Sequence, residues 1–137
     1  MTEPSSGSIR GGEQLRMVAL GQEFSVCKVK DYSQVDIESP FVFTGSTDEE
    51  KSLVCPTAIV PQNTVERDDG WKALRINDIL DFSLIGILAR ISNILAKNGI
   101  GVFAVSTFNT DYFFVKKRDF EKAIKALEDA GFIIEKD

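Results

Sequence analysis

Residues 71–134, WKALRINDILDFSLIGILARISNILAKNGIGVFAVSTFNTDYFFVKKRDFEKAIKALEDAGFII, decide the fold of this chain. Apolar residues alternate over residues 71–76, which predicts a strand, and then recur at spacings of three and four, which predicts an amphipathic helix. Asp81 or Ser83 can cap the start of that helix, and Gly99 is placed to end it in the left-handed conformation. The apolar stripe of the helix comprises Leu84, Ile87, Leu88, Ile91, Ile94 and Leu95.

The elements after this helix complete a known supersecondary pattern. Residues 100–106 are apolar on both faces, so we expect a strand in the interior of the sheet. The turn TFNTD leads to a strand at 112–115, and a second helix is predicted at 118–130, with Gly131 as its stop. Residues 132–134 form the last strand. The order β-α-β-β-α-β predicts a ferredoxin-like unit of the α+β class.

The first half of the chain is less regular. Residues 1–13 are rich in Gly, Ser and Pro, which is typical of a flexible tail. Pro56 and Pro61 bracket a segment with room for one helical turn. The sequence ERDDG at 66–70 is typical of a turn, and we place a domain boundary there. Strands are predicted at 15–20, 24–30, 41–43 and 51–55.

An internal echo relates the two halves. GSTDEEKSLV at 45–54 and VSTFNTDYFFV at 105–115 share a Ser-Thr pair, an acidic turn and a strand that ends in Val. The two segments begin 60 residues apart, and an offset of this size fits tandem copies of one fold. We therefore expect two ferredoxin-like copies after the tail, a degenerate, abbreviated one at 14–67 and a complete one at 68–137.

Composition excludes several classes of protein. The 137 residues are 43% hydrophobic and 27% charged, as in ordinary globular domains. The net charge of −5 argues against nucleic-acid binding, which needs a clustered basic face. No apolar stretch approaches the 18 or so residues of a membrane span, and no signal peptide is evident. We therefore expect a cytoplasmic protein that binds neither nucleic acid nor membrane.

The inventory of reactive side chains is also limited. The chain contains no histidine, which removes the commonest general base and the commonest metal ligand. Cys27 and Cys55 lie in apolar, strand-like runs, where free cysteines behave as small hydrophobic residues. We expect no catalytic residue, no metal site and no cofactor, although an enzyme built from scattered Asp, Lys and Tyr side chains stays open. Trp71 and Phe108 are interpreted as packing residues.

Several motifs carry a family resemblance. They are SLVCP at 52–56, the region of Pro61, GWKAL at 70–74, LDFSLIGILA at 80–89 and STFNTDYFFV at 106–115, and the last two are specific. Residues 71–134 resemble an ACT domain, a βαββαβ unit that senses amino acids. From about residue 15 the chain is similar to a family of short bacterial proteins made of two such domains. That family is related to the aspartate-kinase regulatory region and to the animal arginine sensor. The departure is Asn77-Asp78, where the family commonly has a Glu-Gly-like turn.

The resemblance favours a ligand-binding role for the loop DFSLIG. Backbone N–H groups in the first turn of a helix lack intrahelical partners, and the helix dipole adds positive charge, so a carboxylate can dock there. The alternative is that Asp81 and Ser83 only cap the helix and Gly86, inside its first turn, only allows close packing. The candidate ligand-binding residues of this loop are Asp81, Phe82, Ser83, Leu84, Ile85 and Gly86.

The turn STFNTD supplies the complementary polarity. Asp111 can hold an ammonium or guanidinium group through a charge-assisted hydrogen bond. The alternative is that Asn109 and Asp111 only shape the hairpin turn. The candidate ligand-binding residues of this turn are Ser106, Thr107, Asn109, Thr110 and Asp111.

Three functions are compatible with these patterns. The first is an allosteric sensor that binds a free amino acid and passes the signal to a regulated partner protein. The second is a ligand-free assembly module that acts on a partner, and the third, an enzyme, has no motif in its favour. We also expect a homodimer, because a split βαββαβ unit leaves sheet edges that must be covered.

Overall fold

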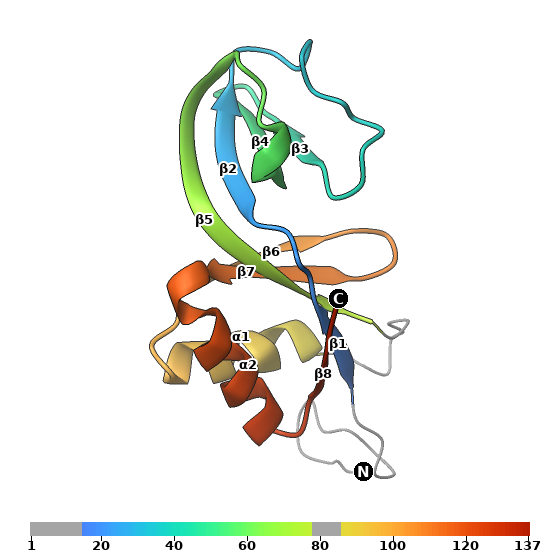
Figure 1. Ribbon diagram of the computed structural model, residues 1–137, viewed down its shortest axis with the longest axis vertical. Helices are drawn as coiled ribbons and strands as arrows, with labels where there is room; N and C mark the ends of the chain where they lie inside the picture. The colour runs from blue at the N-terminus through green and yellow to red at the C-terminus, as the bar shows by residue number, and fades with distance from the viewer. Residues whose placement is uncertain (1–14, 78–85) are drawn as a thin grey trace. The chain divides into compact units, whose positions relative to one another are not determined.

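The computed structural model describes residues 15–77 and 86–137, which divide into two compact units (Figure 1). Unit 1 comprises residues 1–21 and 72–137, and unit 2 comprises residues 22–71. Unit 2 is therefore an insertion in the chain of unit 1. The long strand β5 (Thr64–Ile76) contributes its first part to unit 2 and its last part to unit 1.

Unit 1 has the predicted ferredoxin-like order of elements. The end of β5 is followed by α1 (Ile87–Lys97), β6 (Val102–Ser106) and β7 (Asp111–Lys116). A 3-10 turn, η4 (Lys117–Asp119), then leads into α2 (Phe120–Asp129) and β8 (Ile133–Lys136). This order confirms the predicted α+β unit. No helix among the described residues is long and apolar enough to cross a membrane.

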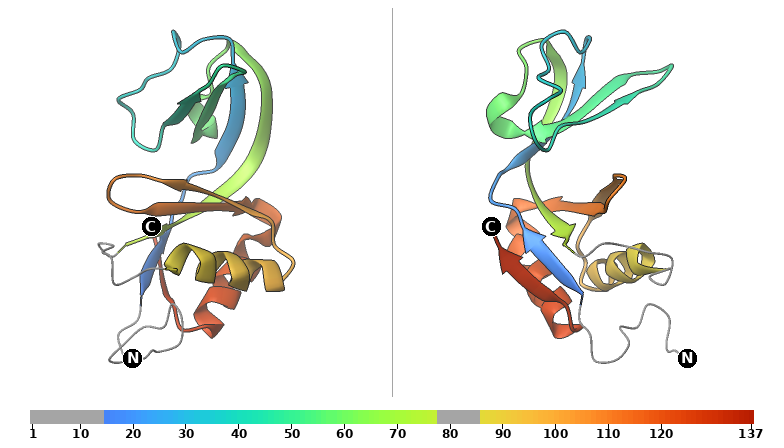
Figure 2. Two further views of the ribbon diagram at one scale, coloured as in Figure 1. Left: turned by 180° about the vertical axis from the view of Figure 1, so that it is seen from behind. Right: turned by 90° about the vertical axis from the view of Figure 1, so that its right-hand side faces the viewer.

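An additional strand lies in the sheet of unit 1. β1 (Arg16–Ala19) pairs with β5 in antiparallel and with β8 in parallel orientation, so that Met17 lies between Ile76 and Ile134. The views of Figures 1 and 2 show β1 and β8 side by side. The strand order is therefore β6-β7-β5-β1-β8. The N-terminal strand separates the first and last strands of the βαββαβ unit.

The core of unit 1 lies between this sheet and the two helices. The spacing of apolar residues in each helix places one stripe toward the sheet, and the stripes are Ile87, Ile91 and Leu95 in α1 and Phe120, Ala123, Ile124 and Leu127 in α2. Both helices end as predicted, at glycines with positive φ, 72° for Gly99 and 104° for Gly131. The N–H of the next residue then donates to a carbonyl of the last helical turn, from Ile100 to Leu95 and from Phe132 to Leu127.

The expectation of an interior position for β6 is wrong. Among the described strands β6 pairs with β7 alone, so one of its edges has no described neighbour. The apolar side chains are explained by packing on its two faces. Val102 packs against the core of unit 1, and the ring of Phe103 stacks on that of Phe114 at 4.7 Å.

Unit 2 is built from strands. β2 (Phe24–Val29), β3 (Phe43–Ser46) and β4 (Lys51–Pro56) join the first part of β5 in the order β3-β4-β2-β5. The one helical turn predicted between Pro56 and Pro61 is confirmed as η2 (Thr57–Ile59), and no α-helix occurs in residues 22–71. The core of the unit comprises Cys27, Val29, Leu53 and Cys55, with Tyr32, Val35, Val42 and Val60 packed against it.

The predicted turn at 66–70 is wrong, because these residues lie within β5. They pair with β2, with Arg67 opposite Cys27 and Asp68 opposite Val26. The register shifts between Phe24 and Val26, and Gly70 has a φ of 84°, so the local turn signal marks an irregularity in a continuous strand. The predicted boundary after residue 67 therefore falls inside β5, and the domains 14–67 and 68–137 stay a prediction.

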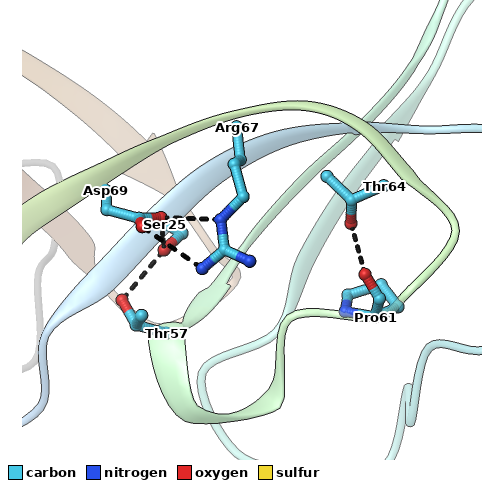
Figure 3. Close-up of polar contacts among 6 residues, drawn as sticks. All are labelled: Ser25, Thr57, Pro61, Thr64, Arg67 and Asp69. Atoms are coloured by element: carbon cyan, nitrogen blue, oxygen red, sulfur yellow. Dashed lines mark hydrogen bonds and ion pairs between the residues drawn. The ribbon is translucent and has the colours of Figure 1, made fainter.

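A buried hydroxyl helps to hold this part of β5 against β2 (Figure 3). Ser25 is completely buried, and its Oγ lies 2.6 Å from Oδ1 of Asp69 and 2.9 Å from Oγ1 of Thr57. Arg67 donates to both carboxylate oxygens of Asp69, at 3.1 and 3.2 Å. The carboxylate thus accepts hydrogen bonds from a buried serine and from an arginine two residues earlier. These bonds satisfy the buried hydroxyl of Ser25, which would be costly to leave unpaired, whereas Arg67 and Asp69 are about half exposed.

The two hairpins repeat one another in detail. In the β3–β4 turn the N–H of Thr47 donates to the carbonyl of Glu50 at 2.9 Å, and in the β6–β7 turn the N–H of Thr107 donates to that of Thr110 at 2.8 Å. Each threonine hydroxyl also accepts from the N–H three residues later. Each hairpin is followed directly by a 3-10 turn, η2 or η4. The echo in the sequence therefore extends to hydrogen bonds and to the next element.

Both cysteines are free and buried, as expected from their apolar neighbourhoods. They occupy β2 and β4, with 3% of Cys27 and 1% of Cys55 exposed. Burial is the main cause that raises the pKa of the Cys55 thiol to about 11, and it also raises the pKa of Cys27. Neither thiol is therefore activated as a nucleophile.

The raised pKa of Cys55 predicts a loss of stability at alkaline pH. The unfolded thiol ionises near its ordinary pKa of 9.0, whereas the folded one keeps its proton to about 11. This group's contribution to the free energy of unfolding is fully present below pH 9 and is lost as the pH rises through 11. We expect the wild type to lose about 2 kcal/mol more than Cys55→Ala over this range in urea denaturation. Parallel pH profiles for the two proteins would contradict the assignment.

Candidate functional site

A polar pocket lies in unit 1 at the C-terminal end of β5. It has a volume of about 390 Å³ and is formed by the end of β5, the β6–β7 turn and the start of β7. The hydroxyl of Thr110 donates to the carbonyl of Ile76 at 2.8 Å, which fixes the turn against the end of β5. The lining residues are Arg75, Ile76, Asn77, Thr107, Asn109, Thr110 and Tyr112.

Arg75 is the charged residue of this lining. Its guanidinium lies over the ring of Tyr112, 5.9 Å from the centroid, and the stack orients the guanidinium group. Hydroxyl and amide groups of the other residues offer both donors and acceptors. A pocket with one cation and several neutral polar groups suits a small polar ligand that carries a carboxylate.

The structure brings part of the predicted site together. Thr107, Asn109 and Thr110 are among the lining residues of the pocket, whereas Asp111 and Gly86 are not. Ser106 lies at the end of β6, exposed and opposite Asp111 in the strand register. The predicted residues Asp81, Phe82, Ser83, Leu84 and Ile85 lie outside the described residues.

Asp111 differs from its prediction. It was expected in a hairpin turn, but it is the first residue of β7 and is only 9% exposed. Side-chain alternation along the strand places it on the same face as Phe113 and Val115, which pack in the helix-covered core. None of the described residues forms a hydrogen bond or an ion pair with its carboxylate. Among the described residues, the buried polar atoms that lack a partner do not include its oxygens, so the carboxylate lies at the edge of the core. Asp111 is a candidate to hold a cationic group.

Gly86 also takes a different position from the predicted one. It is the N-cap of α1, with φ 89° and ψ 0°, rather than a residue of the first helical turn. Neither Asp81 nor Ser83 is therefore the N-cap, and Gly86 itself has no side chain that could cap the helix. Glycine suits this left-handed conformation, in which a side chain would be strained. The backbone N–H groups in the first turn of α1 are the donors that an anion at this end of the helix would use.

The structure also bears on the two aromatic residues that were interpreted as packing residues and on metal binding. Phe108 is fully exposed at the hairpin tip rather than packed, whereas Trp71 is partly buried. Among the described residues no group of three or more His, Cys, Asp or Glu side chains could hold a metal ion.

Sequence reasoning missed Arg75, Asn77 and Tyr112. Each lies in or next to a correctly predicted strand, and their proximity depends on the pairing of β7 with β5. The available signal was a charged residue, Arg75, just before the end of an otherwise apolar strand.

Comparisons with known proteins agree with this architecture. Residues 66–129 match the ACT domain family. A solved structure of a protein from Agobacterium tumefaciens is similar at 28% identity, with a TM-score of 0.78, and the match covers 91% of this chain and 95% of that one. No curated protein matches the chain.

Aspartate kinases share the fold at lower identity. For the enzyme of Clostridium acetobutylicum the identity is 17% and the TM-score 0.61, over 95% of this chain and 36% of that one. For the regulatory subunit of aspartate kinase from Thermus thermophilus the identity is 10% and the TM-score 0.54, over 79% and 91% of the two chains. The chain therefore contains an ACT domain match at residues 66–129 and has a fold that also occurs in a regulatory subunit of aspartate kinase.

Proposed function

We propose that this chain is a regulatory protein that senses a free α-amino acid and catalyses no reaction itself. The ACT domain match and the fold shared with a regulatory subunit support a regulatory role. The observation that carries the proposal is the position of Asp111, a carboxylate at the edge of the core on β7 for which no partner is described. An amino acid would supply the missing positive charge.

The proposed binding mode uses two kinds of polarity. The ammonium or another cationic group of the ligand is held by Asp111, and its carboxylate is held by backbone donors at the start of α1, beside Gly86. We assign the remainder of that loop, residues 81–85, to the same site on the basis of the sequence. Ser106, Thr107, Asn109 and Thr110 would supply neutral contacts. A zwitterion needs both a negative and a positive partner. The carboxylate of Asp111 would be the negative partner, and the backbone N–H groups at the start of α1 would be the positive one.

We further propose that the chain consists of two ACT-like copies, 14–67 and 68–137, the first abbreviated. The repeated turn hydrogen bonds and the 3-10 turns after both hairpins support a tandem origin. The copies do not coincide with the compact units, because β1 pairs with β5 and β8 in unit 1. We therefore propose that the chain is one of the short bacterial tandem ACT proteins, which are related to the arginine sensor, and that it is a cytoplasmic protein with a regulated partner.

A thermal screen of the common amino acids tests the sensor function. We expect one or a few of them to stabilise the fold by about 2.7 kcal/mol at roughly a hundred times the dissociation constant. The melting temperature should then rise by several degrees. Asp111→Asn should lose this gain, because it keeps the shape of the side chain and removes its charge. Without ligand the variant should be at least as stable as the wild type, since no described residue pairs with the carboxylate.

Two further variants make the result specific. Asp129→Asn, which removes an exposed carboxylate on α2, should keep the full ligand response. Arg75→Gln tests the neighbouring pocket: if it loses the response and Asp111→Asn keeps it, the ligand carboxylate binds Arg75 and the assignment of Asp111 is wrong. If no amino acid shifts the wild-type melt at millimolar concentration, the sensor function fails and the assembly module takes its place.

We also propose that the chain forms a homodimer through the edge of β6. That edge has no described neighbour, and the exposed Ala104 is the central residue of the strand. Antiparallel pairing of two copies about a twofold axis would place the two Ala104 residues opposite each other. Ala104→Glu should therefore oppose like charges and shift sedimentation toward the monomer. Thr44→Glu, on the edge strand β3, is the control and should leave the dimer intact. A wild-type monomer at high concentration would contradict the proposal.

A further inference from the structure

We propose that unit 1 carries a second ligand site, which binds a small carboxylic acid that has no ammonium group. The site is the polar pocket of about 390 Å³ at the end of β5. Its volume lies within the range of small-molecule sites. The inference does not rest on the sensor function, because Asp111 and Gly86 are not among the lining residues and Arg75 has no role in the amino-acid site proposed above.

The guanidinium group of Arg75 is the group that would hold the carboxylate. It lies over the ring of Tyr112, 5.9 Å from the centroid, so that the ring orients the planar fork and leaves its N–H edge for a ligand. No carboxylate in residues 15–77 and 86–137 pairs with this guanidinium. Because a guanidinium can donate two parallel hydrogen bonds to one carboxylate, a free carboxylic acid offers the geometry that completes it.

Two side-chain amides add hydrogen-bonding groups to the pocket. Asn77 and Asn109 are exposed lining residues, and neither side chain is hydrogen-bonded within the part of the chain that the structure describes. The threonine hydroxyls are used differently: that of Thr110 donates to the carbonyl of Ile76 at 2.8 Å, and that of Thr107 donates to the carbonyl of Thr110 at 3.1 Å. The two amides can therefore donate to a hydroxyl or carbonyl oxygen beside the carboxylate of the ligand.

The pocket offers no partner for an ammonium group. Among the described residues that line it, none is acidic. In the strand register Val18 lies between Arg75 and Glu135, so that Glu135 is two strands away from Arg75, about 10 Å. Glu135 is also paired with Arg16 at 3.1 Å. An ammonium group in the pocket would therefore be repelled by the guanidinium without a compensating negative charge, which favours a hydroxy or oxo acid over an amino acid.

This pocket and Asp111 lie on opposite faces of the sheet of unit 1. Arg75 lies between Leu74 and Ile76 in β5, and both of these pack in the helix-covered core. Side-chain alternation therefore places Arg75 on the other face. Tyr112 directly follows Asp111 in β7, so the same alternation separates their side chains. Variants at Arg75 and at Asp111 should therefore affect different ligands.

Lactate and alanine test the site, because they share a three-carbon skeleton and differ in having a hydroxyl or an ammonium group. In titrations of the isotope-labelled full chain at constant ionic strength, we expect lactate to cause saturable amide shifts at Asn77, Asn109 and Tyr112. Alanine should bind at these residues about ten-fold more weakly or less, because its ammonium group meets the guanidinium without a counter-charge.

Three variants make the test specific. Arg75→Gln should weaken lactate binding about ten-fold or more, because the charge-assisted hydrogen bonds are lost. Arg75→Lys should also weaken it, because the charge remains but the planar fork is lost. Arg118→Gln, which removes an exposed arginine in η4, is the matched control and should bind lactate as the wild type does.

The proposal is overturned if lactate causes no saturable shift at the pocket or if Arg75→Gln binds it as tightly as the wild type. It is also overturned if alanine binds there as tightly as lactate, since the pocket would then be an amino-acid site. Should Arg75→Gln fail to fold, Arg75→Lys decides: weaker binding of lactate supports the fork contact, and wild-type binding overturns it. Failure of the sensor function gives a different result, in which no amino acid stabilises the fold and lactate still shifts the pocket residues.

Discussion

β5 forms strand pairs along nearly its whole length, with β2 from Thr64 to Trp71 and with β1 from Leu74 to Ile76. β7 pairs with it as well. A slip of one residue in the unit-1 register would move Leu74 and Ile76 away from the helices and expose them. The same register places Arg75 on the face opposite Leu74 and Ile76, so the polar pocket at the end of β5 depends on it. The pairing of β5 therefore decides which of its side chains enter the core and which polar side chains lie on the opposite face.

The helices of unit 1 could be predicted from the sequence because their signals are local. Apolar spacing and the stop glycines Gly99 and Gly131 lie within each helical segment. The long strand β5 could not be predicted in the same way. Residues 66–70 have the local composition of a turn, but β2 and the buried hydroxyl of Ser25 hold them in a strand. Those partners are about 40 residues away in the chain, where local patterns carry no information. The position of β1 between β5 and β8 has the same nonlocal origin.

The candidate site also contains residues that local sequence could predict and residues that depend on distant strand pairing. Thr107, Asn109 and Thr110 belong to one turn, and their polar character alone suggested a binding role. Arg75 and Tyr112 join them only because β7 lies beside β5, a pairing that the sequence does not state. The burial of Asp111 was missed because an aspartate after Asn-Thr has the local signature of a turn, whereas the register with Ser106 makes it a strand residue.

The proposed repeat also accounts for the difference between the two units. After η4 the sequence FEKAIKALED forms α2, with Phe120, Ile124 and Leu127 on its buried face. After η2 the corresponding ten residues are VPQNTVERDD, which place Val60, Thr64 and Arg67 at those positions. Only one of the three is apolar, so a helix here would have no stripe to bury and little tertiary support. The β-branched Thr64 and Val65 favour an extended chain, and the hydrogen bonds of Asp69 with Ser25 and Arg67 stabilise it against β2. Under the proposed repeat, the missing apolar stripe explains why this segment of the first copy continues as the first part of β5 instead of forming a helix.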